Sequence, residues 1–324
     1  MQIEAKEEIW PLKEPFRISR GSRTEIRVVV VTVSGGQHTG RGEGVPLARY
    51  GQSATSVLEQ IESIKSVHDL DRDKLQELLP PGAARNALDC ALWDLEAKKS
   101  GKRVWELVNI PITQEIQTSF TISLDTPEKM AAAAKTNTTA RILKLKLDGD
   151  DLDLARVAAV RVAASNARLL IDTNESWSPA HYREIVLALK ELGVELIEQP
   201  FPADADEVLE ALGHPVPVCA DESCHTTCDL PRLKNRYEVI NMKLDKTGGL
   251  TEALRLCERA RESGFRLLIG CMVGTSLSVA PARLLASITD WVDLDGPLLL
   301  ARDREKGLNY RNGKFDMPSR ELWG

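Results

Sequence analysis

Three carboxylates each follow a short apolar run in the second half of the chain. Asp172, Glu198 and Asp221 are separated by 26 residues (198 − 172) and 23 residues (221 − 198), each about one strand and one helix. Carboxylates packed together repel one another unless a cation lies between them. Hard oxygen ligands without thiolate or imidazole suit Mg²⁺, which keeps positions open for substrate oxygens. The spacing therefore predicts a Mg²⁺ site that stabilises the enolate formed when an α-proton leaves a substrate.

Three lysines lie at comparable positions. Lys144 and Lys146 alternate with leucines in Leu143–Leu147, and Lys243 follows Val239–Met242. An ordinary lysine, with a pKa of about 10.4, is a poor base at neutral pH. A second ammonium group on the same strand face disfavours the charged form, so we expect Lys144 to lower the pKa of Lys146. Lys243 would face the opposite side of a substrate, and one base on each face permits inversion of configuration, as in a racemase or epimerase.

Each of these residues, taken alone, also has a simpler interpretation. An acid at a strand end, such as Asp221, is most often a helix N-cap or a solvated loop residue. Lys144 and Lys146 could be the solvent face of an edge strand. Barrel strands, however, are covered by helices outside and filled by side chains inside, so two lysines on one face need a function or a carboxylate partner. The occurrence of all these residues in register across several strands favours a catalytic site.

The elements that would position these residues alternate from about residue 116. Apolar runs cover Ile116–Ile122, Ile142–Leu147, Leu169–Thr173, Glu195–Gln199, Val216–Ala220, Val239–Leu244, Leu267–Met272 and Trp291–Leu294, with helix-like segments between them. Eight strand–helix units in a row predict a TIM-type (β/α) barrel, whose chemistry lies at the carboxyl ends of the strands. The alternative is a doubly wound open sheet. No Gly-x-Gly-x-x-Gly follows the first strand, which favours the closed barrel.

The first part of the chain has a different pattern. Ile26–Val33 is a β-branched run typical of a strand, and Ala84–Ala97 carries a helical apolar stripe that Gly101 would cap. Strands first and helices afterwards predict a small α+β capping domain. We expect this domain to cover residues 1–115, joined by the returning tail 301–324, and the barrel to cover residues 116–300.

Composition excludes several classes of partner. The net charge is 42 − 48 = −6 and no basic run is present, so nucleic acid is not expected to bind. No run approaches the roughly 18–20 apolar residues that span a bilayer, so no membrane association and a cytoplasmic location are expected. Cys224, His225 and Cys228 lack a second Cys/His pair, so a zinc site is not expected either.

Five short motifs occur in the order that the strands predict. They are Lys144-x-Lys146, Asp172-x-Asn174, Glu198-Gln199-Pro200, Asp221-Glu222-Ser223 and Asn241-Met242-Lys243. In this order they resemble the muconate-lactonising subgroup of the enolase superfamily, over nearly the whole chain. Within that subgroup, Gly21–Arg23, Gly82–Asp94 and Leu244–Leu250 are similar to stretches of the dipeptide epimerases.

The resemblance implies a role for each residue of the site. Asp172, Glu198 and Asp221 would bind Mg²⁺, Lys146 and Lys243 would be the two acid/base catalysts, and Lys144 would support them. The reaction would invert the α-carbon of the C-terminal residue of a dipeptide, L-Ala-D/L-Glu in the first place, and would serve the recycling of murein peptides. The alternatives are an epimerase of a different dipeptide and another reaction of the superfamily, such as o-succinylbenzoate synthesis or muconate cycloisomerisation.

The resemblance also implies contacts with the substrate. Asp293 and Asp295 match the pair that holds the α-ammonium group of a dipeptide. Arg23 matches a loop residue that meets the distal carboxylate of the substrate, with Arg20 and Arg17 as neighbouring alternatives. Cys271 and Met272 match a segment that lines the specificity pocket.

Classes outside the superfamily fit less well. A Schiff-base aldolase would use a lysine but has no need of three acids, and a binding module would not need all five catalytic positions. The subunit count stays open, and a homo-oligomer is compatible with the sequence.

Overall fold

Eight parallel strands form the centre of the structure. The computed structural model describes residues 1–137 and 139–324. The strands follow one another in chain order: β5 (Phe120–Ile122), β6 (Ile142–Lys146), β7 (Arg168–Asp172), β8 (Val194–Glu198), β9 (Val218–Ala220), β10 (Val239–Met242), β11 (Arg266–Gly270) and β12 (Trp291–Asp293). The amide of Ser119 donates to the carbonyl of Val292 (2.9 Å) and so joins the last strand to the first. The sheet closes, and the predicted β/α barrel is confirmed.

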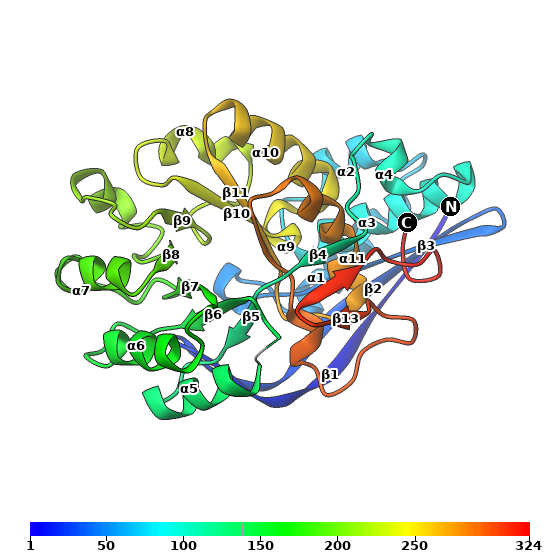
Figure 1. The fold of residues 1–324 in the computed structure, drawn as a ribbon. Helices are drawn as coiled ribbons and strands as arrows, with labels where there is room; N and C mark the ends of the chain where they lie inside the picture. Colours follow the sequence, from blue (N-terminus) through cyan, green and yellow to red (C-terminus); the bar gives the residue numbers. More distant parts are fainter. Residues whose placement is uncertain (138) are drawn as a thin grey trace.

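Helices cover the outside of the barrel (Figure 1). They are α5 (Pro127–Thr136), α6 (Asp153–Ala163), α7 (Pro179–Glu191), η2 (Asp206–Ala211), η3 (Thr227–Asp229), α8 (Leu230–Leu233), α9 (Leu244–Thr247), α10 (Leu250–Glu262), α11 (Ser276–Leu285) and η4 (Ala286–Ile288). The eighth predicted unit differs, because within the described residues β12 is followed by the short 3₁₀ helix η5 (Gly296–Leu299) alone. Leu300 then bridges to Leu12 of β1 (Gln2–Ile18), so the chain runs against the N-terminal strand instead of forming a last helix.

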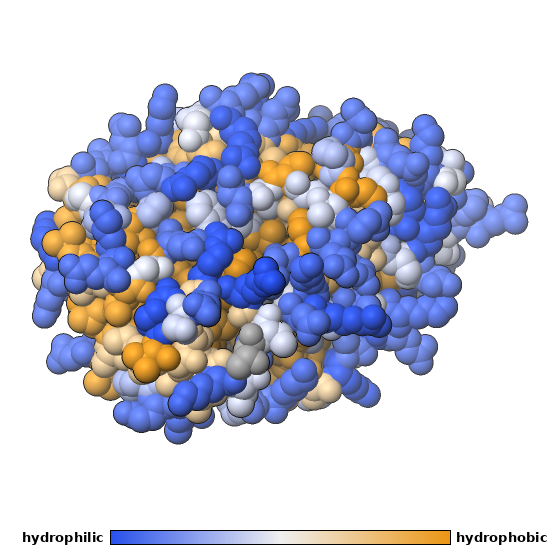
Figure 2. Space-filling model, in the orientation of Figure 1, coloured by the Kyte–Doolittle hydropathy of each residue, from blue (hydrophilic) through white to orange (hydrophobic). Residues whose placement is uncertain are grey.

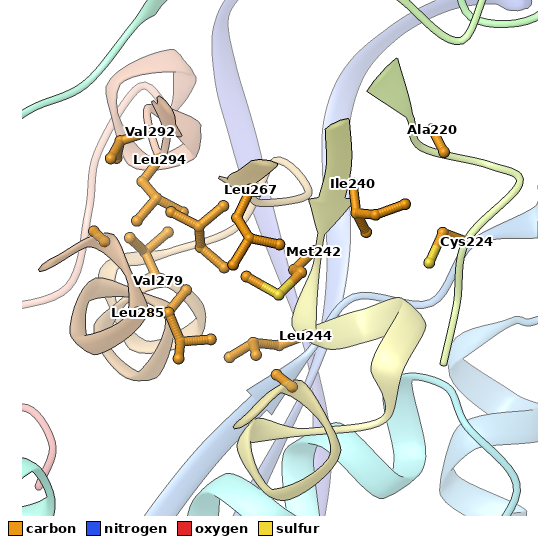
Figure 3. Close-up of a cluster of buried hydrophobic side chains, with 14 of the residues drawn as sticks. Ala220, Cys224, Ile240, Met242, Leu244, Leu267, Val279, Leu285, Val292 and Leu294 are labelled. Carbon is orange, nitrogen blue, oxygen red and sulfur yellow. The ribbon is translucent and has the colours of Figure 1, made fainter. Parts of the chain in front are cut away.

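Successive residues of the barrel strands point to opposite sides, as in any β-strand. One apolar set contributes one residue from most strands and packs together inside the barrel: Ile142, Leu170, Leu196, Cys219, Val239, Leu268 and Trp291. The other set packs outward, and Figure 3 shows part of it, with Leu267 of β11 between Met242 of β10 and Val279 of α11. Residues two and four positions beyond the inner set therefore point inward as well, towards the carboxyl end of the barrel.

The capping domain consists of an antiparallel sheet and several helices. The sheet is β1, β2 (Gly21–Gly35) and β3 (His38–Gly44), and the helices are η1 (Ala48–Tyr50), α1 (Ala54–Ile64), α2 (Arg72–Leu78), α3 (Ala83–Ser100) and α4 (Val104–Leu107). Gly40, Gly42 and Gly44 let α3 lie directly on β3, because a Cβ atom at any of them would meet a carbonyl oxygen of α3 at 2.1–2.2 Å. The predicted α+β capping domain is confirmed.

The tail joins both parts of the molecule. β14 (Lys314–Asp316) pairs with β13 (Tyr310–Arg311) on one side and with β4 (Glu115–Gln117) on the other. The predicted strand Ile116–Ile122 is therefore divided between this small sheet and the barrel. The amide of Gly324 donates to Asp94 of α3 (2.7 Å). The tail thus returns to the capping domain, and the boundaries at residues 115 and 300 stay predictions.

The surface is predominantly hydrophilic. Figure 2 shows this for one face, with apolar patches on the side of α6 and α7, where Val162 and Leu187 are exposed. Among the described helices, none has the length and apolar character needed to cross a membrane.

Candidate active site

The inward register of the strands brings the predicted polar residues to one end of the barrel. Each lies two or four positions beyond a residue of the inner apolar cluster: Lys144, Lys146, Asp172, Glu198, Asp221, Lys243 and Asp293. All of them are buried. Lys146 is paired in register with Asp172, and Asp172 with Glu198, so neighbouring strands place them side by side.

The three predicted metal ligands meet at this end. Oxygens of Asp172, Glu198 and Asp221 lie within 4.8 Å of one another, and these residues are at most 3% exposed. Burial, and after it the charge of Asp172, raises the pKa of Glu198 to about 8. Burial also acts to raise the pKa of Asp172, but the charges of Lys146 and Lys144 outweigh it and lower that pKa. The triad therefore concentrates negative charge that a cation would stabilise.

The donor set fits Mg²⁺. All three candidate ligands are carboxylates, the ligand class that Mg²⁺ prefers. The buried Asp221 Oδ1 has one cationic neighbour, Lys246 Nζ at 2.7 Å, but accepts no well-directed hydrogen bond among the described residues, so a lone pair there is available to a cation. Hydrogen bonds orient the other two acids. Asn241 Nδ2 donates to Glu198 Oε1 (2.9 Å), and the main-chain N–H of Asn174 donates to Asp172 Oδ1 (2.9 Å).

Lys144 lies in the middle of the acids. Its Nζ is 2.7 Å from Glu198 Oε2, 2.7 Å from Asp293 Oδ2 and 3.3 Å from Asp172 Oδ2. Burial would lower the pKa of Lys144, but these carboxylates, Asp293 foremost, raise it well above its usual range. The positive charge of Lys144 is therefore balanced locally, which limits its influence on Lys146. The tuning role stays a prediction.

The two predicted acid/base lysines contact different acids of the triad. Lys146 Nζ lies 2.5 Å from Asp172 Oδ2 and Lys243 Nζ lies 2.5 Å from Asp221 Oδ2. β6 and β10, which carry them, are four strands apart in an eight-stranded barrel and thus lie across it from each other. Burial would lower the pKa of Lys243, but the charges of Asp221 and Glu198 raise it. A substrate above the triad would have one ammonium group on each side.

The two acids at the end of β12 have different environments. Asp293 is paired with Lys144 and accepts a hydrogen bond from the Ser119 hydroxyl. Asp295 Oδ2 accepts a hydrogen bond from the amide of Thr121 (2.6 Å). Burial, followed by the charge of Asp293, raises the pKa of Asp295 to about 7. Of the pair, Asp295 is the acid without a lysine or arginine partner among the described residues.

The predicted arginines lie around the β1–β2 turn, with Arg17 at the end of β1, Arg20 in the turn and Arg23 at the start of β2. Arg20 bonds to the barrel, with Nη1 2.9 Å from the Asn174 carbonyl and Nη2 2.7 Å from Glu222 Oε1. Arg17 is paired with Asp125 (2.9 Å). Arg23 pairs with no carboxylate in the part of the chain that the structure describes. Burial, and then the charge of Arg20, lowers its pKa. Of the three arginines, Arg23 is thus the one whose guanidinium hydrogens are not already paired with a carboxylate and can bind a substrate carboxylate.

Cys271 and Met272 follow β11 and are half-buried. A Cβ atom on Gly296 would lie 3.2 Å from Cys271 Sγ, so this segment lies against the chain that follows Asp295. Burial, and then the charge of Asp295, raises the pKa of the Cys271 thiol. The structure therefore places these two predicted pocket residues beside the β12 acids.

The two halves of the chain each match a known family. Residues 1–109 match the N-terminal domain of mandelate racemase and muconate lactonizing enzyme, and residues 128–321 match the enolase C-terminal domain-like family. The chain belongs to the mandelate racemase/muconate lactonizing enzyme family. The predicted membership of the enolase superfamily is confirmed.

Relatives within this family cover nearly the whole chain. It is 46% identical to the L-Ala-D/L-Glu epimerase of Escherichia coli K12 over 97% of this chain and 99% of that protein. It is also 44% identical to an N-acetyl-D-glutamate racemase of a Pseudoalteromonas species, over 92% of this chain and 95% of that one. The predicted resemblance to the dipeptide epimerases is confirmed.

Solved structures of the family agree with this relationship. An enolase family member from Agrobacterium tumefaciens with homology to dipeptide epimerases, with bound sodium and L-Ala-L-Glu, superposes with a TM-score of 0.97 at 48% identity and covers 99% of each chain. A dipeptide epimerase from Methylococcus capsulatus, complexed with Mg and L-Arg-D-Lys, has a TM-score of 0.92 at 30% identity, over 99% and 98% of the chains.

The structure adds residues to this family site that the sequence reasoning did not assign. Asn241 orients Glu198, and Ser119 holds Asp293 from the segment before β5. Glu222 accepts a hydrogen bond from Arg20 and so joins the β1–β2 turn to the barrel. The position of Asn241, midway between the inward Val239 and Lys243, indicates from the sequence that its side chain points into the barrel. The role of Ser119 could not be predicted from the sequence, because its contact with Asp293 depends on how the barrel closes.

Proposed function

We propose that this chain is a Mg²⁺-dependent epimerase that inverts the α-carbon of the C-terminal residue of a dipeptide, with L-Ala-D/L-Glu as its preferred substrate. The observation that carries the proposal is the placement of Lys146 and Lys243 on opposite sides of one buried carboxylate triad. A single acid/base group would return a proton to the face from which it came. Two groups on opposite faces permit inversion.

Each lysine has a defined part in this reaction. For one epimer, neutral Lys146 takes the α-proton at Nζ while Lys243, as an ammonium, gives a proton to the opposite face; for the other epimer the roles are reversed. Asp172 and Asp221 each direct one of the two Nζ atoms towards the triad (2.5 Å each). A Mg²⁺ ion bound by the triad would supply positive charge beside the substrate carboxylate and so stabilise the deprotonated substrate.

Two further contacts would select the substrate. Asp295, with support from Asp293, would receive the α-ammonium group of the dipeptide. Arg23 would bind the side-chain carboxylate of the glutamate, for which its planar guanidinium offers two parallel hydrogen bonds. The availability of Asp295 and Arg23, which lack ion-pair partners among the described residues, supports both assignments.

Racemisation of N-acetylglutamate is the second candidate. The relative with this activity in its name is nearly as similar to the chain as the dipeptide epimerase. The pKa of Asp295, raised to about 7, allows this acid to be protonated and to donate a hydrogen bond to an acyl oxygen. The dipeptide is favoured because two buried carboxylates stand side by side at the end of β12, an arrangement that a cation stabilises.

Proton exchange in D₂O tests the proposal. L-Ala-L-Glu or L-Ala-D-Glu is incubated with the protein and Mg²⁺, and the glutamate α-proton signal is followed by NMR; we expect exchange and formation of the other epimer. Lys146→Ala and Lys243→Ala should each abolish epimerisation. Each variant should still exchange the α-proton of the epimer that the remaining lysine serves.

Several results would contradict the proposal. Exchange with N-acetyl-L-glutamate but with no Ala dipeptide would select the second candidate. Full activity in excess EDTA would exclude the metal, and normal epimerisation by either lysine variant would exclude the two-base reaction. If the dipeptide reaction is found, we propose that it serves the recycling of murein peptides in the cytoplasm.

A further inference from the structure

A fourth lysine lies next to the triad and takes no part in the proton transfers proposed above. Lys246 belongs to α9, the short helix that directly follows Lys243, and its side chain is fully buried. Its Nζ donates to the main-chain carbonyls of Asp221 and Asn241, the latter at 2.9 Å, and lies 2.7 Å from Asp221 Oδ1. Three oxygens therefore surround an ammonium group with three hydrogens.

Two lysines thus share the Asp221 carboxylate, with different constraints. Lys243 Nζ lies 2.5 Å from Oδ2 and has no hydrogen bond to the main chain among the described residues. Lys246 Nζ is tied to two carbonyls at the ends of β9 and β10. Lys243 can therefore move towards a substrate, whereas Lys246 stays in place.

The helix that carries Lys246 is itself fixed from outside the barrel. Arg85 of α3 donates from Nη2 to the Thr247 carbonyl (2.7 Å) and from Nε to the Gly248 carbonyl (3.2 Å). Gly248 has a φ of 74°, and a Cβ atom there would lie 2.4 Å from Arg85 Nε. These contacts dock the stretch Gly82–Asp94 onto Leu244–Leu250.

We propose that Lys246 is a positioning residue that fixes the orientation of the Asp221 carboxylate for Mg²⁺. The proposal rests on the metal site of the proposed function. Lys246 donates to the main-chain carbonyl of Asp221 and forms an ion pair with Oδ1 of the same residue, so it keeps the carboxylate in one orientation relative to the main chain. The same lone pairs then face the ion throughout the reaction. Partners that orient metal ligands change metal affinity or activity by about 10–100-fold when they are removed.

Calorimetric titration with Mg²⁺ in the absence of substrate tests this role. We expect Lys246→Gln, which cannot supply three donors, to bind Mg²⁺ about tenfold more weakly than the wild type. A higher Mg²⁺ concentration should then restore part of the lost kcat/KM. Lys98→Gln is the matched control, because Lys98 also pairs with a buried acid, Asp94 (2.7 Å), but on the capping helix α3. Its Mg²⁺ affinity should equal that of the wild type.

The outcomes separate this inference from the proposed function. A wild type that binds no Mg²⁺ would refute the metal site itself. If the wild type binds Mg²⁺, equal affinity in Lys246→Gln would overturn the positioning role. Tighter binding would also overturn it, since Lys246 would then only offset negative charge. Should Lys246→Gln not fold, the same titration is made with Lys246→Arg, whose planar head does not match the three oxygens, and unchanged affinity would again overturn the inference.

Discussion

Two groups of three acids each bring their carboxylate oxygens close together in space, but they differ in the cations that surround them. In the part of the chain that the structure describes, Asp172, Glu198 and Asp221 form one group, and Asp148, Asp150 and Asp153 form the other, each with oxygens within 4.8 Å of one another. The second group lies between β6 and α6 around one arginine. Arg156 Nη1 is 2.5–3.0 Å from an oxygen of each of its acids. The first group is surrounded by lysines from several strands.

The difference shows that proximity of acids does not by itself indicate a metal site. The loop acids come from one segment of six residues, and Asp148 and Asp150 are partly exposed. Their arginine is permanently charged and also donates to the carbonyl of Asp125 (2.9 Å), so it stays between them. The triad acids come from three strands, are fully buried, and include an oxygen, Asp221 Oδ1, that accepts no well-directed hydrogen bond among the described residues. We therefore assign chemistry to the triad and a structural role to the loop.

Matched amide substitutions in the two groups should give the largest contrast. Glu198→Gln removes one charge from the triad, so Mg²⁺ binding should be lost and kcat/KM should fall by about 10³-fold or more, because the ion is worth several kcal/mol to the reaction. Asp150→Asn removes one charge from the loop group and should leave kcat/KM within about twofold. Steady-state kinetics with parallel Mg²⁺ titration measure both. A Glu198→Gln protein that binds Mg²⁺ normally would refute the assignment.

Removal of the central arginine should affect stability instead of chemistry. Arg156→Ala leaves the buried Asp153 without its permanently charged partner, which should lower the free energy of unfolding by about 3 kcal/mol. Asp153 keeps its hydrogen bond from Trp177 Nε1 (2.8 Å), so the loop should still fold. Urea unfolding measures the loss, and kcat/KM of the folded variant should stay within about twofold. Unchanged stability together with a large loss of kcat would mean that the loop acids and Arg156 serve the chemistry, and would contradict their structural role.

Much of the barrel and its chemistry could be predicted because both depend on local periodicity. The alternation of Lys144 and Lys146 with leucines already places them on one face, and the spacing of about 25 residues between acids reflects one strand and one helix. The structure confirms the barrel, and it places the three acids together. These features could be predicted because each depends only on the strand to which the residue belongs.

Features that depend on how distant segments meet could not be predicted. The division of Ile116–Ile122 between two sheets results from the pairing of β4 with β14, and the missing last helix results from the contact of Leu300 with Leu12. The pairing of Lys144 with Asp293 joins residues 149 positions apart and occurs because the barrel closes. Lys246 was visible as a motif residue, but nothing in its neighbours in sequence indicates that it reaches Asp221.

Asp295 is an acid that has no lysine or arginine partner among the described residues, in contrast to both groups of three acids. The smallest of the expected effects on kcat/KM concerns this residue. Its pKa, raised to about 7, means that the free protein holds this carboxyl partly protonated at neutral pH, whereas an ordinary aspartate would be ionised down to about pH 4. Only the ionised form attracts the ammonium group of a dipeptide. The kcat/KM for the dipeptide should therefore fall as the pH decreases below about 7, by up to about tenfold per unit.

Asp295→Asn separates this titration from that of the other groups in the site. The variant should have a lower kcat/KM for the dipeptide at pH 8, and the ratio of wild type to variant should shrink as the pH decreases from 8 to 5. Groups that titrate alike in both proteins cancel in that ratio, so the change reports Asp295 together with its interaction with Asp293. A constant ratio across this range would mean that Asp295 is ionised throughout or does not contact the ammonium group. The acid pair would then have to bind the substrate through Asp293, at the expense of its ion pair with Lys144.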